Sequence, residues 1–597
     1  MIFLIAISSL LHLDTVYCST KLRWFKAHDL PCRFCTKKFQ NIGLMPEHTE
    51  RLNNGELQDH IISIQRIDSP PKCRLDDRFL SFSLDTLELM RGLRCFPLTS
   101  RKINTLVRAL APAYLRVGGT PQDFLLFADD REKTASAVKH LSNNENVVNK
   151  VDYFQTKLTQ QNSLQQNQQL LHKLKQPKQQ QQRHHQRQNP QTKKQDTASD
   201  VNREKCSPFF ENWSRMKKFE YTRSEFSALY NFTRQNNLRL IFGLNGLTRD
   251  ASRKWNPNVA TKKILREYSD RVDWEIGNEP NRFNKYGKRS AVKARQLARD
   301  EGSLRTILNN TQSRIYGPDI AKPTYKSLKY LKNFLAAKPS VDAVTYHLYE
   351  MHSTVATLER YMNPMHVMKI EEEMGWIDSI VRNSPLSNTT TDIWVGETGS
   401  SSGGGAPGLS DRFVSGFHYL SKIGLAAEHC HKVLIRQSLY GGYYGMLDPV
   451  SHNPLPDYWL TVLFKRLVKN VVLSSSSVTK KDPFFRTQLY CSRNHGGADV
   501  VVSFVNMRRG RDSTLTLAGF EDRLVEKYVF SNPRDLQSSQ VYLNGVLLEL
   551  SRVDTGGDVG DFELPAMDSV LDKQPVLIPR ASYGFLVVKN VQADACQ

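Results

Sequence analysis

The chain is 597 residues long, 39 % of its residues are hydrophobic, and its formal net charge is +22. This length exceeds one typical domain, and the low apolar fraction argues against a chain that is globular throughout. The positive charge favours polyanionic partners, namely acidic glycans, nucleic acid or anionic membranes, and the cellular compartment must decide among them.

Residues 1–18 have the layout of a secretory signal, with an apolar run from Ile2 to Leu13 and a cut expected after Cys18. A buried N-terminal strand is the alternative, since no Lys or Arg precedes the run. The run is too short to span a bilayer, and no other segment reaches about 18 apolar residues, so no integral membrane segment is expected. Because a secreted protein meets extracellular glycans, nucleic acid is not the expected partner.

Secretion is also compatible with four Asn-x-Ser/Thr glycosylation sites, which are Asn212, Asn231, Asn309 and Asn388. Of the nine cysteines, an even number remains once Cys18 is lost, which favours disulfides in an oxidising compartment. Cys32 and Cys35 have the CxxC spacing of zinc or redox sites, but no second pair lies at a zinc-like distance. A local disulfide or free thiols is the preferred interpretation, and neither a metal nor a cofactor is expected.

Residues 19–57 form a polar, basic N-terminal extension, and residues 58–79 contain a strand, Ile61–Ile67, that joins a C-terminal β domain. From Leu80 onward, apolar runs typical of buried strands alternate with helix-compatible stretches such as Lys326–Ala337 and Arg412–Gly424. Strands separated by helices predict an α/β fold, a parallel (β/α)8 TIM barrel over residues 80–127 and 206–469. The predicted strands are Leu80–Asp85, Tyr114–Gly119, Leu238–Asn245, Val272–Pro280, Arg314–Asp319, Ala343–Tyr349, Asp392–Thr398 and Lys432–Gly441.

Between the second and third strands, residues 128–205 are predicted to form a disordered linker, which has 16 Gln between Val151 and Asp200. Such a polar, basic stretch cannot bury a core, and its His184-His185 pair is expected to be solvated rather than metal-binding. After about Asn470 short alternating runs predict a flanking C-terminal β-sandwich over residues 470–597. Its predicted strands are Gln488–Tyr490, Val500–Val505, Thr514–Leu517, Gln540–Val546 and Tyr583–Val588.

Two glutamates stand out at the strand ends. Glu279 in WEIGNEPN and Glu397 in WVGETGS each close a buried strand, and the C-terminal strand ends form the active face of such barrels. Paired carboxylates suit cleavage of a glycosidic bond, because one protonates the leaving oxygen while the other meets the anomeric carbon. Ordinary surface carboxylates are the alternative. The other strand ends contribute Asp85, Gly118-Gly119, Asn245, Asp319, His347 and Gln437 to the predicted lining.

Several longer segments resemble the heparanase family. They are AYLRVGGTPQDFLLF, LIFGLNGL, DWEIGNEPN, YGPD, WVGETGSSSGGGAPGLSDRF and PLPDYWLTVLFKRLV, and the similarity covers residues 80–127 and 209–596. The resemblance implies a retaining endo-β-glucuronidase that cuts the heparan sulfate of proteoglycans. It also implies a secreted enzyme of the extracellular matrix or the lysosome, and a barrel with a flanking β-sandwich.

By this resemblance, Glu279 matches the family's acid/base and Glu397 its nucleophile. A retaining enzyme holds these carboxyls about 5–5.5 Å apart, and we expect repulsion by ionised Glu397 to raise the pKa of Glu279. Asn278 is expected to bind a sugar hydroxyl, while His347 and Tyr349 resemble the family's polar contacts beside the nucleophile.

The remaining residues implied by the resemblance surround a sugar chain. The expected sugar contacts are Asp85, Thr120, Gly403, Gly404 and Tyr444, to which Gln437 is added as a strand end of the predicted lining. The first of two heparan-binding segments contains Lys217, Lys218 and Arg223, and the second contains Lys322, Lys326 and Lys329, whose spacing predicts one helical face. A solvated surface is the alternative for both segments. Cys491 and Cys596 resemble a family disulfide of the C-terminal domain, and the family's other disulfide has no evident match.

The departures from the family concern substrate preference and activation. Pro121 and Ser402 stand where the family has a basic and an aromatic residue, and Thr324-Tyr325 where it has arginines. An activating protease excises the family's linker, and here the Gln-rich stretch takes its place without a recognisable cleavage sequence. The alternative functions are a catalytically silent heparan-binding relative, which would typically lack one carboxylate, and an exo-β-glucuronidase on other glycans.

Overall fold

The computed structural model describes most of the chain after the N-terminal region. The described residues are 58–64, 70–130, 216–309, 311–386, 392–479, 482–493, 498–553 and 561–597. The predicted signal segment, the CxxC pair, the Gln-rich linker beyond residue 130 and the sequons at Asn212 and Asn388 lie outside this set. Asn231 and Asn309 lie within it, and both are exposed.

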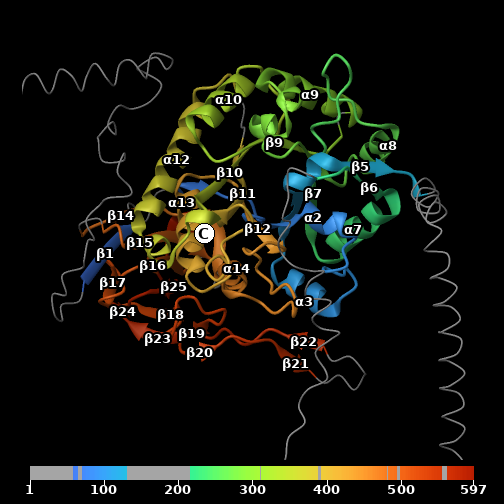
Figure 1. Ribbon diagram of the computed structural model, residues 1–597. Coiled ribbons are helices and arrows are strands. Elements are labelled where there is room, and N and C mark those ends of the chain that lie inside the picture. Colours follow the sequence, from blue (N-terminus) through green and yellow to red (C-terminus); the bar gives the residue numbers. More distant parts are fainter. Residues whose placement is uncertain are drawn as a thin grey trace, which may run out of the picture.

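Eight parallel strands close into a barrel in the order β10-β11-β12-β3-β4-β7-β8-β9 (Figure 1). Each predicted barrel strand occurs, which confirms the (β/α)8 fold, and β10 and β11 run further than predicted. The strands are β3 (Leu80–Asp85), β4 (Ala113–Gly118), β7 (Leu238–Leu244), β8 (Asp273–Ile276), β9 (Ile315–Ile320), β10 (Ala343–His352), β11 (Asp392–Ser402) and β12 (Val433–Tyr440).

The lower part of the barrel interior is packed with large side chains. Tyr114, Tyr316 and Trp394 come from the N-terminal halves of their strands and are buried together, with the rings of Tyr316 and Trp394 4.2 Å apart. These rings fill the barrel from below, as in other barrels of this class. The two glutamates singled out in the sequence lie toward the opposite, C-terminal end of the strands.

Helices surround the barrel and begin at side-chain caps where the sequence provides them. The helix α7 opens with a capping box in which Thr222 and Glu225 satisfy each other's backbone N–H groups. The helices are α2 (Thr86–Met90), α3 (Arg101–Ala109), α7 (Arg223–Gln235), α8 (Val259–Glu267), α9 (Ala294–Ile307), α10 (Tyr325–Leu335), α11 (Leu358–Tyr361), α12 (Pro364–Arg382), α13 (Ser415–Glu428) and α14 (Pro456–Leu467). A short two-stranded ribbon, β5 (Leu125–Ala128) with β6 (Phe219–Thr222), lies beside them.

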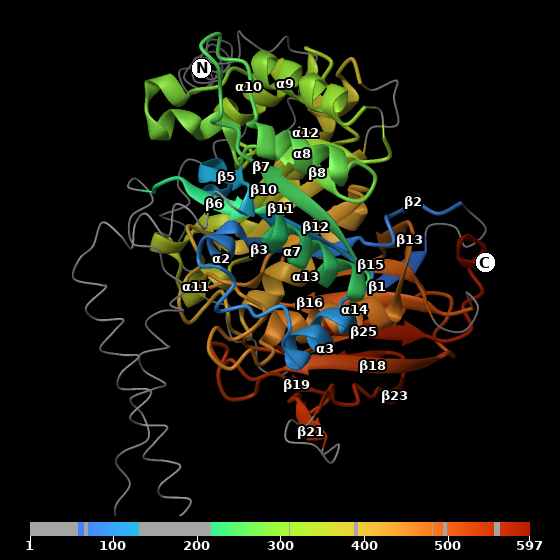
Figure 2. The same ribbon diagram turned by 90° about the vertical axis from the view of Figure 1, so that its right-hand side faces the viewer.

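A two-sheet β-sandwich packs against the barrel below α13 and α14 (Figure 2). The smaller sheet has the order β14-β1-β17-β24, with β1 (Gln58–Ile64), β14 (Ser475–Ser477), β17 (Ser513–Leu517) and β24 (Val576–Ile578). The larger contains β2 (Cys73–Arg74), β13 (Val468–Val472), β15 (Phe485–Ser492), β16 (Val500–Asn506), β18 (Leu524–Ser531), β19 (Tyr542–Leu543), β20 (Val546–Leu547), β23 (Val570–Lys573) and β25 (Ser582–Val588). A hairpin of β21 (Ser551–Val553) and β22 (Asp561–Glu563) is separate.

The predicted strand Gln540–Val546 is wrong, because two short strands occur there. Asn544 and Gly545 between them have φ of 50° and 85°, which makes a tight turn rather than a continuous strand.

Cys491 and Cys596 form a disulfide, as the resemblance implied. A further disulfide joins Cys73 of β2 to Cys430 just before β12. None of the described helices is both long and apolar enough to cross a membrane.

Candidate active site

Glu279 and Glu397 lie at the C-terminal end of the barrel. Glu279 opens the 3-10 helix η5 (Pro280–Tyr286) just beyond β8, with a left-handed backbone of φ 53° and ψ 54°. A residue with a side chain seldom adopts this conformation, and it occurs preferentially at functional sites. Glu397 lies within β11, where a register shift in the pairing with β10 sets it beside His347. The two glutamate side chains are 15 % and 10 % exposed.

The imidazole of His347 joins the two glutamates. Its Nδ1 atom lies 3.4 Å from Oε1 of Glu279 and 3.8 Å from Oε1 of Glu397. On the other side of the ring, Nε2 lies 3.7 Å from Oδ1 of Asp319, and the whole side chain is buried. Because both glutamates lie within reach of one ring nitrogen, their carboxylates converge on one place, as cleavage of a single glycosidic bond requires.

Charges around His347 decide where the proton resides. Burial lowers the pKa of His347, but the charge of Glu397 and the contacts with Asp319 and Glu279 raise it to about 10. Burial raises the pKa of Glu279, yet its hydrogen bond with His347 and the charges of His347 and Arg282 bring it below the ordinary value. The predicted upward shift of Glu279 is therefore wrong for the free protein. The neighbouring cation outweighs burial, so the proton sits on the imidazole.

Arg116 of β4 is fully buried beneath the glutamates and binds several acids at once. Its Nε donates to Oε2 of Glu275 at 2.8 Å, and its Nη1 donates to Oε2 of Glu397 at 2.9 Å. Its Nη2 donates to Oδ2 of Asp319 at 3.1 Å and to Oδ1 of Asn278 at 3.4 Å. A buried guanidinium with this many acceptors fixes their orientation. Arg116 therefore fixes the position of Glu397 relative to the residues at the ends of β8 and β9.

The second oxygen of Glu397 is held by Tyr349 of β10, whose hydroxyl donates to Oε1 at 2.6 Å. Asn278 is held in a similar way, since its backbone N–H donates to Oδ2 of Asp123 at 3.1 Å. Donors on both oxygens fix the orientation of the Glu397 carboxylate, which a nucleophile needs.

A second group of predicted residues forms one wall of the site. The side chain of Gln437 donates to Oδ2 of Asp85 at 3.1 Å and to the hydroxyl of Tyr444 at 3.4 Å, while it accepts from Ser83. Gln437 is thus occupied in orienting Asp85 and Tyr444. Burial, with smaller contributions from the charges of Glu397 and a neighbouring glutamate, raises the pKa of Asp85 to about 7.

Glycines surround this wall. Gly119 precedes the half-buried Thr120, and a Cβ added to Gly119 would lie 2.9 Å from Oδ2 of Asp85. Gly403 and Gly404 follow β11 with φ of 80° and 89°, a conformation that glycine adopts at little cost. An added Cβ on Gly404 would meet open space, so its backbone is accessible to a ligand.

The two predicted heparan-binding segments are exposed only in part. Lys217 and Lys218 are exposed directly before β6. Arg223 makes a two-pronged ion pair with Glu267 at 2.6 and 2.8 Å, so its charge is partly neutralised. Lys326 and Lys329 are exposed on α10.

The prediction that Lys322 shares one helical face with Lys326 and Lys329 is wrong. The helix α10 begins only after its cap Thr324, so Lys322 lies outside it. Its ammonium group donates to the carbonyl of Tyr349 at 2.6 Å and lies 3.3 Å from Glu373. Lys322 therefore ties α12 to the end of β10 and does not extend the exposed basic face.

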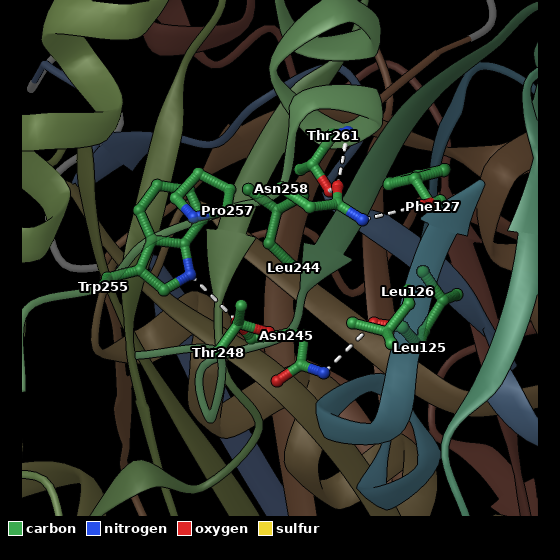
Figure 3. Close-up of a pocket in the computed structure, with 10 residues that line it drawn as sticks. All are labelled: Leu125, Leu126, Phe127, Leu244, Asn245, Thr248, Trp255, Pro257, Asn258 and Thr261. Carbon is green, nitrogen blue, oxygen red and sulfur yellow. Dashed lines mark hydrogen bonds between the residues drawn. The ribbon is translucent and has the colours of Figure 1, made fainter. Parts of the chain in front are cut away.

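An apolar pocket lies next to the end of β7 (Figure 3). It is closed by hydrogen bonds from the loop after β7 and the start of α8 to β5, such as those from Asn245 to the carbonyl of Leu125 and from Asn258 to that of Phe127. None of Glu279, Glu397 and His347 lines it. We interpret it as packing between the β5–β6 ribbon and the barrel.

Arg116, Glu275 and Arg282 were not identified from the sequence. Arg116 stands within the apolar run AYLRVG, and a buried charge in a strand is a signal that a partner must exist, although the partner cannot be named. Arg282 gives no such signal, yet its Nη1 lies 3.3 Å from Oε2 of Glu279. Its position becomes evident only once η5 turns the chain back over the glutamate.

Comparisons with known proteins show which family the chain resembles. Residues 194–424 match the family model described as glycosyl hydrolase family 79, N-terminal domain. The chain is 32 % identical to the heparanase of Bos taurus over 87 % of this chain and 89 % of that protein. It is 28 % identical to inactive heparanase-2 of Homo sapiens, over 88 % of each chain, and 28 % identical to a hyaluronoglucuronidase of Hirudo nipponia, over 64 % of this chain and 80 % of that protein.

Solved structures share the fold. The 4-O-α-L-rhamnosyl-β-D-glucuronidase of Fusarium oxysporum has a TM-score of 0.55 at 13 % identity and covers 88 % of this chain and 100 % of its own. The GH51 arabinofuranosidase of Xanthomonas axonopodis has a TM-score of 0.54 at 11 % identity, with 89 % and 100 % covered. At these identities the likeness concerns the arrangement of barrel and β-sandwich.

Proposed function

This chain belongs to the heparanase family of glycoside hydrolases, and from that premise we propose that it is a retaining endo-β-glucuronidase which cleaves the heparan sulfate of proteoglycans. One observation carries the proposal: Glu279 and Glu397 both lie within reach of the same nitrogen of His347. Both carboxylates are present, which argues against a silent heparan-binding relative.

In the proposed first step, a carboxylate oxygen of Glu397 attacks the anomeric carbon of a glucuronic acid unit. The bond to the leaving oxygen breaks, and that oxygen takes a proton from Glu279, so that a glycosyl-enzyme ester remains. In the second step Glu279 removes a proton from water, the resulting oxygen attacks the same carbon, and Glu397 is released. Two inversions give net retention.

The proton for the first step is proposed to come from His347. In the free protein the imidazole is protonated and Glu279 is ionised. Transfer from Nδ1 to the neighbouring oxygen of Glu279 makes the acid just as the substrate excludes water. The proton that Glu279 later takes from water returns along the same contact.

The residues around Glu397 support its assignment as nucleophile. Arg116 and Tyr349 donate to its two oxygens, so the carboxylate is held in a fixed orientation. Both donors must be released in part as the ester forms, which makes them positioning residues that also stabilise the departing carboxylate in the second step.

The charge distribution supports a long acidic substrate. The net charge of +22 attracts sulfated chains over a distance, and the exposed Lys217, Lys218, Lys326 and Lys329 offer local contacts. The open backbone of Gly404 could receive a carboxylate or sulfate from such a chain. An exo-acting enzyme on short glycans has no use for additional exposed basic residues on two separate segments.

Secretion to the extracellular matrix or the lysosome, and processing by an activating protease, belong to the proposal. The disulfides Cys73–Cys430 and Cys491–Cys596 are typical of an oxidising compartment. The strands that flank residues 128–205 pair directly with each other as β5 and β6, so excision of the intervening linker would leave the fold connected through this ribbon.

Digestion of size-defined heparan sulfate by the purified secreted protein tests the proposal, with Glu397→Gln as the matched control. We expect oligosaccharides from the natural chain and none from the variant. Release of free glucuronic acid alone would indicate an exo enzyme. Binding without any cleavage, before and after protease treatment, would identify a silent heparan-binding protein.

A further inference from the structure

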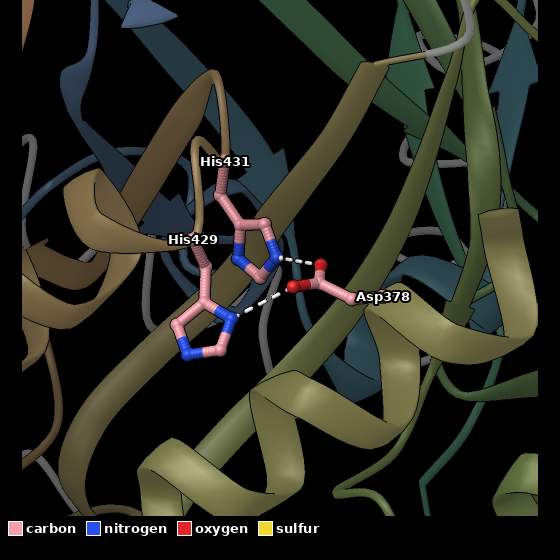
Figure 4. Close-up of side chains that lie close together, drawn as sticks. All are labelled: Asp378, His429 and His431. Atoms are coloured by element: carbon pink, nitrogen blue, oxygen red, sulfur yellow. Dashed lines mark hydrogen bonds and ion pairs between the residues drawn. The ribbon is translucent and has the colours of Figure 1, made fainter. Parts of the chain in front are cut away.

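Two histidines and one aspartate form a cluster (Figure 4) near the start of β12, at the N-terminal end of the barrel strands and opposite the glutamates. Asp378 belongs to the last turns of α12, while His429 and His431 belong to the connection from α13 into the start of β12. Nδ1 of His429 lies 2.7 Å from Oδ2 of Asp378, and Nε2 of His431 lies 2.9 Å from Oδ1. The reaction proposed above uses none of these groups.

We propose that Asp378, His429 and His431 form a binding site for one divalent transition-metal cation, with Zn²⁺ as the best-matched ion. Each residue presents one ligand atom to the same place, and these atoms all lie within 4.8 Å of one another. Two imidazole nitrogens and one carboxylate oxygen form a ligand set that Zn²⁺ takes in proteins, usually with water as the fourth ligand. Mg²⁺ and Ca²⁺ prefer oxygen ligands and fit poorly.

The surroundings of His431 match those of a metal-binding imidazole. Its Nδ1 lies 3.1 Å from the hydroxyl of Tyr346, and the ring is fully buried. When Nε2 binds the metal, the ring proton resides on Nδ1 and is donated to Tyr346. Such a second hydrogen bond fixes the tautomer and the orientation of a ligating histidine. To accept a cation, each histidine must move its proton from the nitrogen that faces Asp378 to its other ring nitrogen, from Nε2 to Nδ1 in His431 and from Nδ1 to Nε2 in His429.

The solvent access and the rigid backbone of this cluster also suit a metal-binding site. The side chain of His429 is 18 % exposed and that of Asp378 is 11 % exposed, so one side of the cluster is open to solvent for the ion and a water ligand. Cys430, between the two histidines, is bonded to Cys73 of β2, which anchors the connecting backbone. Arg382 lies 3.6 Å from Oδ2 of Asp378, but its side chain is 70 % exposed and can turn away into solvent.

A bound cation would join α12 to the start of β12 and thus act as a structural clamp. It would sit away from the sugar-binding end, so the readout is binding and stability rather than turnover. Binding that a protein makes only in its folded state raises the temperature of unfolding.

Calorimetric titration of the chelator-treated full chain with Zn²⁺, and absorption spectra of its Co²⁺ form, test the site. The natural protein should bind about one ion per chain, with the visible Co²⁺ bands of a four-coordinate site and a Tm increase of a few degrees. His429→Gln and Asp378→Asn should each lower the Zn²⁺ affinity at least about tenfold and abolish the Tm increase, since each removes one ligand. Tyr346→Phe should weaken binding by a smaller factor.

Two control variants test whether Zn²⁺ binds at this cluster rather than elsewhere on the protein. His452→Gln removes a half-buried histidine elsewhere, and Glu397→Gln removes a carboxylate of the candidate active site; both should bind Zn²⁺ like the natural chain. Because His429 is partly exposed, His429→Gln should fold, which circular dichroism checks. Unchanged affinity in folded His429→Gln, or no binding by the natural chain at about 0.1 mM Zn²⁺, a concentration far above that needed by built zinc sites, would overturn the proposal.

Discussion

Nδ1 of His347 lies 3.4 Å from Oε1 of Glu279, and this contact reverses the expected behaviour of the acid/base. Proximity of Glu397 was expected to push the pKa of Glu279 upward. The charge of Glu397 acts instead on His347, whose pKa rises to about 10, and the resulting imidazolium lowers the pKa of Glu279. In the free enzyme the reactive proton therefore resides on His347, whose imidazole contacts the acid/base Glu279.

His347→Gln should show whether the imidazole holds the proton that Glu279 uses. Without the imidazolium, the proton must reside on Glu279 itself, so the alkaline limb of kcat/KM should move to lower pH than in the natural enzyme. Turnover of substrates with poor leaving groups should fall about 10²-fold, the usual scale of general acid catalysis. Substrates with good leaving groups should be affected less. A uniform loss with an unchanged pH profile would assign His347 a structural role.

Glu279→Ala should separate substrates by the acidity of their leaving groups. Natural heparan sulfate needs protonation of the leaving oxygen and should be cleaved at least about 10²-fold more slowly. An aryl glucuronide with an acidic phenol should form the glycosyl-enzyme at a nearly natural rate, because its leaving group departs as an anion. Equal losses on both substrates in stopped-flow assays would contradict the acid/base role.

Asp85 should make substrate affinity depend on pH. Its pKa is raised to about 7, chiefly by burial, so the side chain is mostly neutral below that pH and anionic above it. An acidic sugar should therefore bind more weakly as the pH rises through about 7. Asp85→Asn keeps a neutral side chain of similar shape, so its affinity should stay flat over this range. A titration by fluorescence or calorimetry from pH 5 to pH 9 measures both proteins, and parallel curves would exclude Asp85 as the source.

The exposed lysines should account for part of the salt dependence of heparan binding. Lys326→Glu/Lys329→Glu, and separately Lys217→Glu/Lys218→Glu, should each weaken binding about tenfold at low salt and flatten its dependence on ionic strength. Arg223→Gln provides a control, because Arg223 is already paired with Glu267. If both double variants bind like the natural chain, these lysines are only solvated surface.

The barrel was predictable because each strand is a short apolar run with a helix after it. Glu279 and Glu397 were predictable because each follows or ends such a run, which fixes its position at one end of the barrel. The helix expected over Lys326–Ala337 matches α10, but the inclusion of Lys322 on its face was wrong, because the cap at Thr324 makes the helix begin after Lys322. Periodicity alone carries no information about such a boundary.

Long-range contacts account for what the sequence did not reveal. Arg116 meets Glu275 and Glu397 only through the closed barrel, and the Cys73–Cys430 bond spans 357 residues. The sign of the pKa shift at Glu279 depends on the position of His347, two strands away. Residue types could suggest these groups, but only their distances decide which charge dominates.

Trapping of the glycosyl-enzyme tests the central claim most directly. A 2-deoxy-2-fluoro glucuronide with a good leaving group slows the second step more than the first, so the ester should accumulate. Mass spectrometry of the digested protein should find the sugar on Glu397, and the label should be absent in Glu397→Gln. A label on Glu279 or another residue, or continued cleavage of heparan sulfate by Glu397→Gln, would contradict the assignment.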